Sequence, residues 1–100
     1  MKLSKTVLIT GATGGLGQAL CRQFAREGYP LIITGRNPSR LTTLARRLQA
    51  AYGVEVRTIE LDLGVQGGAQ ALCERLGQMG AQVDILVNNA GFGLGGPFVE

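Results

Sequence analysis

Short apolar runs alternate with helical periodicities along almost the whole of this 100-residue chain. The apolar runs occupy residues 6–10, 31–34, 54–61 and 84–88. Between them, residues 15–27, 38–52 and 69–79 repeat apolar side chains every three or four positions, as the buried face of a helix does. Strands that alternate with helices form parallel sheets through right-handed crossovers. The sequence therefore predicts an α/β fold with a doubly wound parallel sheet in the order β-α-β-α-β-α-β.

Local residues predict where the helices begin and end. Asn37 followed by Pro38 is typical of an N-cap and a first helical position, and Gly53 predicts the end of that helix. Three glycines weaken the pattern of the third helix, since each costs roughly 1 kcal/mol relative to Ala. In the first helix the apolar residues recur every four positions, at Leu16, Leu20 and Phe24.

Several chemistries are excluded by residue types that are missing or isolated. Histidine is absent, which excludes Ser-His-Asp triads, Cys-His pairs and His-bearing zinc sites, so we expect no metal site. Cys21 and Cys73 lie far apart, which predicts buried free thiols and a reducing, cytoplasmic setting. No apolar run approaches the roughly 18 residues that a membrane span needs, so we expect no membrane partner.

Charge is distributed unevenly along the chain. Residues 1–50 carry eight Lys or Arg and one acid, whereas residues 51–100 carry two Arg and six acids. The basic half could face phosphate groups, or it could supply solvated helix faces. Only five aromatic residues and no known nucleic-acid-binding motif are present, so we expect no nucleic-acid partner.

A cluster of glycines follows the first predicted strand and opens the first predicted helix. Gly11, Gly14, Gly15 and Gly17 fall within seven residues. Such residues let the backbone approach a pyrophosphate closely, at a helix N-terminus that offers free N–H groups. A P-loop is excluded because no Lys follows these glycines, and the GxGxxG fingerprint fails at Leu20.

The remaining pattern, Thr10-Gly11-x-x-x-Gly15-x-Gly17, resembles the TGxxxGxG turn of the short-chain dehydrogenase/reductase family. The extended branch of that family uses TGxxGxxG, which this turn also matches. Asn88-Asn89-Ala90-Gly91 after the fourth predicted strand resembles the main branch instead. The resemblance implies that residues 1–100 are the N-terminal part of a single dinucleotide-binding Rossmann domain, incomplete at its C-terminal end.

The same resemblance implies which residues bind the cofactor. An Asp placed like Asp62 bonds the adenine ring in this family, although the residue could instead be the N-cap of the third helix. The implied cofactor-binding residues are Gly11, Thr13, Gly15, Leu16 and Gly17 in the turn, Arg36 and Asn37 after the second strand, Asp62 and Leu63 after the third, and Asn89, Ala90 and Gly91 after the fourth.

The end of the second predicted strand favours NADP over NAD. NAD-preferring sites place a carboxylate there for the ribose 2′-OH, but this chain has Arg36 and no nearby acid. A guanidinium can instead bind the 2′-phosphate of NADP. Arg40 is a weaker second candidate, whereas we expect Arg46 and Arg47 to face solvent.

The family's catalytic residues are a Tyr-x-x-x-Lys pair assisted by Ser and Asn, and the pair does not occur here. Neither Tyr29 nor Tyr52 has Lys four positions later. We therefore expect the NADP-binding half of a short-chain oxidoreductase that transfers hydride between NADP(H) and a carbonyl or alcohol substrate, with these 100 residues inactive alone. The alternative is a non-catalytic nucleotide-binding or sensor module.

The resemblance also implies a homo-oligomeric parent enzyme whose remaining segments follow this chain. Pro97 would open a fourth helix after a glycine-rich loop at residues 90–96. A single helical turn is not stable alone, and a sheet that ends at the fourth strand exposes an apolar edge. We expect disorder or self-association near this end.

Overall fold

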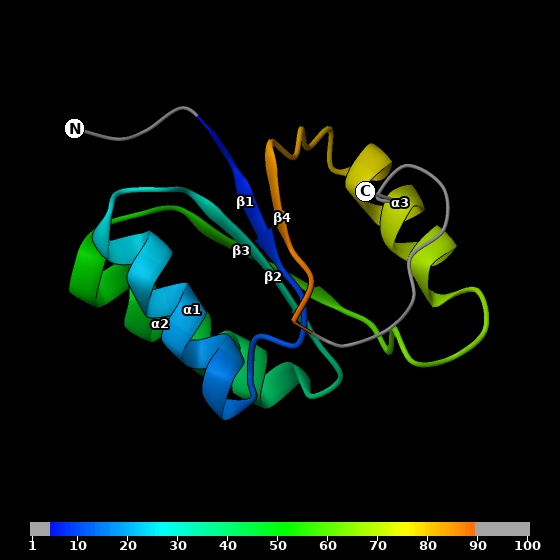
Figure 1. Cartoon of the computed structure of the whole chain (residues 1–100), viewed down its shortest axis with the longest axis horizontal. Coiled ribbons are helices and arrows are strands. Elements are labelled where there is room, and N and C mark those ends of the chain that lie inside the picture. The colour runs from blue at the N-terminus through cyan, green and yellow to red at the C-terminus, as the bar shows by residue number, and fades with distance from the viewer. Residues whose placement is uncertain (1–4, 90–100) are drawn as a thin grey trace.

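The computed structural model describes residues 5–89. Strands and helices alternate in the predicted order (Figure 1). The predicted loop at residues 90–96, the helix from Pro97 and the expected disorder or self-association lie outside the described residues. The elements are β1 (Val7–Ile9), α1 (Gly15–Arg26), β2 (Leu31–Gly35), α2 (Pro38–Tyr52), β3 (Val56–Glu60), α3 (Gly68–Gln78) and β4 (Ile85–Val87).

The four strands form one parallel sheet in the order β3-β2-β1-β4. Helices α1 and α2 cover one face of this sheet, and α3 covers the opposite face (Figure 1). Along β1, Val7 and Ile9 join the apolar cluster beneath α1 and α2, whereas Leu8 joins the cluster beneath α3. Both faces of the central strands are therefore buried, and the predicted doubly wound sheet is confirmed.

The chain reverses its direction of winding at β1. This strand pairs with β2 on one side and with β4 on the other, so the crossovers lead away from it in opposite directions. In doubly wound sheets, ligands bind beyond the carboxyl ends of the strands at such a reversal. Residues that follow β1, β2 and β3 meet at that edge.

The most buried residues of helix α1 are not its large apolar ones. Leu16 is 67% exposed, so the predicted stripe is wrong there, whereas Leu20 and Phe24 are half-buried and Phe24 packs against the apolar cluster beneath α1 and α2. The buried face instead carries small residues: Gly17, Cys21 and Ala25. A Cβ at Gly17 would lie 2.1 Å from the Gly11 carbonyl oxygen, so α1 packs closely against the turn before it.

Burial raises the pKa of the Cys21 thiol to about 12, against an ordinary value of 9.0, while the nearby Arg22 lowers it slightly. This thiol therefore stays protonated at neutral pH and is a poor nucleophile. Cys73 is also free but only half-buried. The predicted free thiols are confirmed, but full burial applies to Cys21 alone.

Helix α2 has the predicted ends. The Asn37 side-chain oxygen accepts a hydrogen bond from the Arg40 N–H at 3.1 Å, which caps the first turn. At the other end Gly53 has φ +68°, a left-handed conformation that Gly adopts at low cost. These two caps, with Pro38 at the first helical position, explain why this helix was predictable from local sequence.

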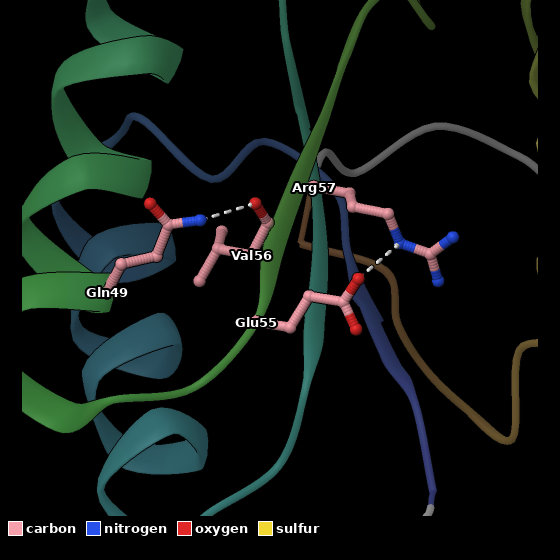
Figure 2. A network of polar contacts seen from close by, with 4 residues as sticks. All are labelled: Gln49, Glu55, Val56 and Arg57. Atoms are coloured by element: carbon pink, nitrogen blue, oxygen red, sulfur yellow. Dashed lines mark hydrogen bonds and ion pairs between the residues drawn. The ribbon is translucent and has the colours of Figure 1, made fainter.

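The C-terminal half of α2 is fixed to the sheet by a side-chain contact. Gln49 donates a hydrogen bond from Nε2 to the Val56 carbonyl at 3.1 Å, where β3 begins (Figure 2). Beside it, Arg57 and Glu55 form an ion pair at 3.9 Å (Figure 2). Because that pair is largely exposed, it contributes at most about 1 kcal/mol.

Within residues 5–89, no helix is both long and apolar enough to cross a membrane. The same part of the chain holds no cluster of acids and cysteines able to bind a metal ion.

Candidate cofactor-binding site

The glycine turn between β1 and α1 leaves a helix N-terminus without a side-chain cap. Gly14 is the N-cap residue, and the first turn of α1 contains no acid. The first intrahelical bond runs from the Gln18 N–H to the Gly14 carbonyl at 2.8 Å. The backbone N–H groups of residues 15–17 therefore have no acceptor within the helix, which favours an anion at this position.

The glycines of this turn differ in what surrounds them. Gly11 has φ +61°, in the left-handed region that favours Gly. Gly17 is buried against the backbone of Gly11 and Ala12, with no room for a side chain. At Gly15, by contrast, an added Cβ would meet no atom within 4 Å. Gly17 therefore allows close packing, and Gly15 leaves open space beside the helix N-terminus.

A pocket of about 510 Å³ lies beyond the carboxyl ends of β1, β2 and β3. Five predicted site residues line it, namely Gly11, Thr13, Arg36, Asp62 and Leu63. Four further residues complete the lining: Gly14, Arg40, Leu61 and Gly64. The predicted residues that do not line this pocket are Gly15, Leu16, Gly17, Asn37 and Asn89, whereas Ala90 and Gly91 lie outside the described residues.

Asp62 shapes the loop after β3. Its Oδ1 accepts a hydrogen bond from the Gly64 N–H at 2.9 Å, the geometry of a side chain that closes a local turn. The N-cap of α3 is Gly67, so the alternative in which Asp62 caps this helix is wrong. The carboxylate lines the pocket and is half-buried.

Gly68 is one of the three glycines that weaken the sequence pattern of α3. In the structure it is buried, and an added Cβ would lie 2.8 Å from the Asp62 carbonyl oxygen and 2.9 Å from the Leu63 Cα. Its small size therefore lets α3 pack against the segment that lines the pocket. This contact joins a helix to the loop before it, and only the fold shows it.

The end of β4 is bonded to the glycine turn across the sheet. Asn89 donates from Nδ2 to the Gly11 carbonyl at 3.0 Å. On the neighbouring strand, the Thr10 hydroxyl donates to the Asn88 side-chain oxygen at 3.1 Å. An Asn side chain at a strand end can bond neighbouring backbone, and Asn89 makes such a bond. It holds the pocket wall rather than lining it.

Positive charge dominates this pocket. Arg36 and Arg40 both line it and are exposed, whereas Asp62 is its one acidic lining residue. In the described part of the chain, the only ion pair joins Glu55 to Arg57, so neither pocket arginine is neutralised by a carboxylate. The end of β2 carries Gly35 and then Arg36, with no acid in the lining there.

The sequence of this chain matches a known protein family. The sequence model of the short chain dehydrogenase family matches residues 5–100. Sulfoacetaldehyde reductase 2 of Chromohalobacter salexigens is 45% identical over 92 residues, which cover 92% of this chain and 36% of that protein.

Two solved structures share the fold. L-sorbose reductase from Gluconobacter frateurii, complexed with NADPH and L-sorbose, has a TM-score of 0.80 and 37% identity, and the match covers 90% of this chain and 34% of that one. A short-chain dehydrogenase from Sphingobium yanoikuyae in complex with NADPH has a TM-score of 0.77 and 40% identity, over 94% of this chain and 36% of that one. The present chain thus spans about a third of the length of these proteins. On the match of its sequence over residues 5–100, this chain belongs to the short-chain dehydrogenase family.

Proposed function

We propose that these residues form the NADP(H)-binding part of an oxidoreductase that transfers hydride between the nicotinamide cofactor and a carbonyl or alcohol substrate. The observation that carries the proposal is the pocket beyond the carboxyl ends of the strands, where Arg36 and Arg40 stand and the end of β2 supplies no acid. We further propose that residues 1–100 belong to one dinucleotide-binding domain.

The residues present fit a dinucleotide. The open space at Gly15 and the uncapped N-terminus of α1 suit a pyrophosphate, which needs close backbone approach and N–H donors. Asp62 and Leu63, which also line the pocket, are our candidates for the adenine ring. We assign the remaining implied residues Thr13, Leu16, Gly17, Asn37, Asn89, Ala90 and Gly91 to the same binding region, by contact or by support of its walls.

The preference for NADP rests on charge. A carboxylate at the end of the second strand would accept the ribose 2′-OH of NAD and repel a 2′-phosphate. Arg36 stands there instead, and its planar fork can bind a phosphate with two parallel hydrogen bonds. The NADPH bound in the two structures above supports this assignment for the present chain.

In the reaction the cofactor supplies or accepts the hydride, and this chain's residues hold and orient it. We assign no acid or base to residues 1–100. The lysines are Lys2 and Lys5, and neither follows a Tyr at the required spacing. We also propose a cytoplasmic location, since free thiols fit a reducing compartment.

The replacement Arg36→Ala tests the cofactor preference. We expect the affinity for NADPH to fall about 10- to 100-fold, because a charge-assisted hydrogen bond contributes about 1.5–3 kcal/mol. The affinity for NADH should change by less than about threefold. Calorimetric titration of both cofactors measures this, with Arg46→Ala as a control that removes the same charge outside the pocket. Equal losses for both cofactors would contradict the role of Arg36.

The alternative is a nucleotide-binding or sensor module without chemistry. Oxidation of NADPH by the complete protein with a panel of aldehydes and ketones distinguishes the two functions. We expect carbonyl-dependent oxidation. Tight NADPH binding without turnover of any carbonyl or alcohol would favour the sensor.

A further inference from the structure

A second hollow, of about 270 Å³, adjoins the cofactor pocket. Its polar lining comes from the glycine turn, the start of α1 and one face of α2: Thr13, Gln18, Ser39, Arg40, Thr43 and Arg47. Thr13 and Arg40 also line the cofactor pocket, so the two hollows meet at these residues.

Helix geometry explains why α2 lines this hollow with two arginines. Arg40, Thr43 and Arg47 follow the spacing i, i+3, i+7, which places them on one side of the helix. From the sequence alone, Arg47 is expected to face solvent. It is exposed, but it also lines the hollow, whereas the neighbouring Arg46 lines none of the hollows described here.

The hollow has positive charge and no acid to balance it. None of its lining residues is acidic, and α2 contains no acid along its whole length. The groove continues beyond Arg47 into a smaller hollow of about 110 Å³, which adds Arg22 and again no acid. Cations that share a concave site without a counter-charge raise the local potential and attract anions.

The donors in the hollow suit one kind of anion. Guanidinium groups bind phosphate oxygens with paired, charge-assisted hydrogen bonds. The hydroxyl groups of Ser39 and Thr43 can donate to the same oxygens. We propose that this hollow is a subsite for a phosphate monoester, held between Arg40 and Arg47.

The phosphate could come from two sources. One is the 2′-phosphate of the cofactor, shared through Arg40 between the two hollows, and this source rests on the proposed function. The other is a separate phosphate, free or on a small molecule. A separate phosphate would compete for Arg40 and lower the affinity for NADPH.

The test first measures binding of inorganic phosphate to the complete protein without cofactor, by calorimetry at constant ionic strength. We expect saturable binding that Arg47→Gln weakens about tenfold, while the matched control Arg46→Gln changes it by less than about twofold. Absence of saturable binding, or equal effects of the two replacements, would overturn the proposal. Because this measurement contains no cofactor, its result does not depend on the proposed function.

If phosphate binding depends on Arg47, a second measurement shows whether the phosphate comes from the cofactor or from a separate molecule. The dissociation constants of NADPH and NADH are compared for Arg47→Gln and Arg46→Gln, with and without phosphate. A loss by Arg47→Gln that affects NADPH alone, in the absence of phosphate, supports the 2′-phosphate as occupant. An unchanged NADPH-to-NADH ratio, with loss of inhibition by phosphate, supports a separate phosphate. If the wild-type protein shows no preference for NADPH, the proposed function fails while the phosphate result stands.

Discussion

At the scale of single residues, two neighbouring glycines have opposite roles. Gly17 is enclosed by backbone atoms of the turn, and Gly15 faces open space. We expect Gly17→Ala to lower the free energy of unfolding by about 3 kcal/mol or more, because a backbone carbonyl cannot move aside as a flexible side chain can. Urea denaturation measures the change.

The matched replacement Gly15→Ala should keep the free energy of unfolding within about 1 kcal/mol, since Ala is the better helix former. It should nevertheless weaken NADPH binding, because a methyl group would occupy space beside the helix N-terminus. If Gly15→Ala and Gly17→Ala lower the free energy of unfolding equally, Gly15 does not face open space. If Gly15→Ala binds NADPH normally, the pyrophosphate lies elsewhere.

At the scale of elements, the start of α2 is determined by a local side-chain cap, whereas the start of α3 is determined by a tertiary contact. We expect Asn37→Ala to cost about 1 kcal/mol of unfolding free energy, because the Arg40 N–H loses its acceptor. Asn37→Ser should retain most of the stability, since Ser is also a good N-cap. Denaturant titration of the three proteins measures this, and equal stability of Asn37→Ala and wild type would contradict the cap.

Helix α3 begins differently. Its N-cap, Gly67, has φ +81° and no side-chain bond. The helix starts where Gly68 can lie against the Asp62 carbonyl, which is a tertiary contact. This explains why local sequence predicted the start of α2 to the residue and placed the start of α3 one residue late.

At the scale of the whole molecule, β4 links the two ends of the described chain. At one end of the β1–β4 pair, Asp84 accepts a hydrogen bond from the Thr6 N–H at 2.9 Å. At the other end, Asn89 donates to the Gly11 carbonyl at 3.0 Å. Only the second bond lies at the carboxyl edge, next to the pocket.

These two bonds provide a matched pair of replacements. We expect Asp84→Ala and Asn89→Ala each to lower the free energy of unfolding by about 1 kcal/mol. Only Asn89→Ala should also weaken NADPH binding, by several-fold, because it frees the turn that lines the pocket. Thermal unfolding and calorimetric titration measure both effects. Similar NADPH affinities for the two variants would show that β4 does not position the turn.

The sequence by itself determined the order of elements, the parallel sheet and the caps of α2, because these depend on periodicity and on contacts within a few residues. The family resemblance implied Gly11, Thr13, Arg36, Asp62 and Leu63 as cofactor-binding residues, and the structure brings these five to one pocket, because the carboxyl ends of parallel strands share an edge. Their role in binding stays a prediction. Only the family resemblance predicted a binding role for Asp62, because the side chain closes a local turn and does not cap α3.

The tertiary structure alone decided which side of α1 is buried. Large apolar residues predicted one face, but the close approach of the turn at Gly17 selected the small residues Cys21 and Ala25. It likewise brought Arg40 and Arg47 to the rim of a hollow shared with α1. The spacing of two arginines on a helix is the same whether they face water or a neighbouring helix, so only the packing of α1 against α2 distinguishes a solvated face from a binding site.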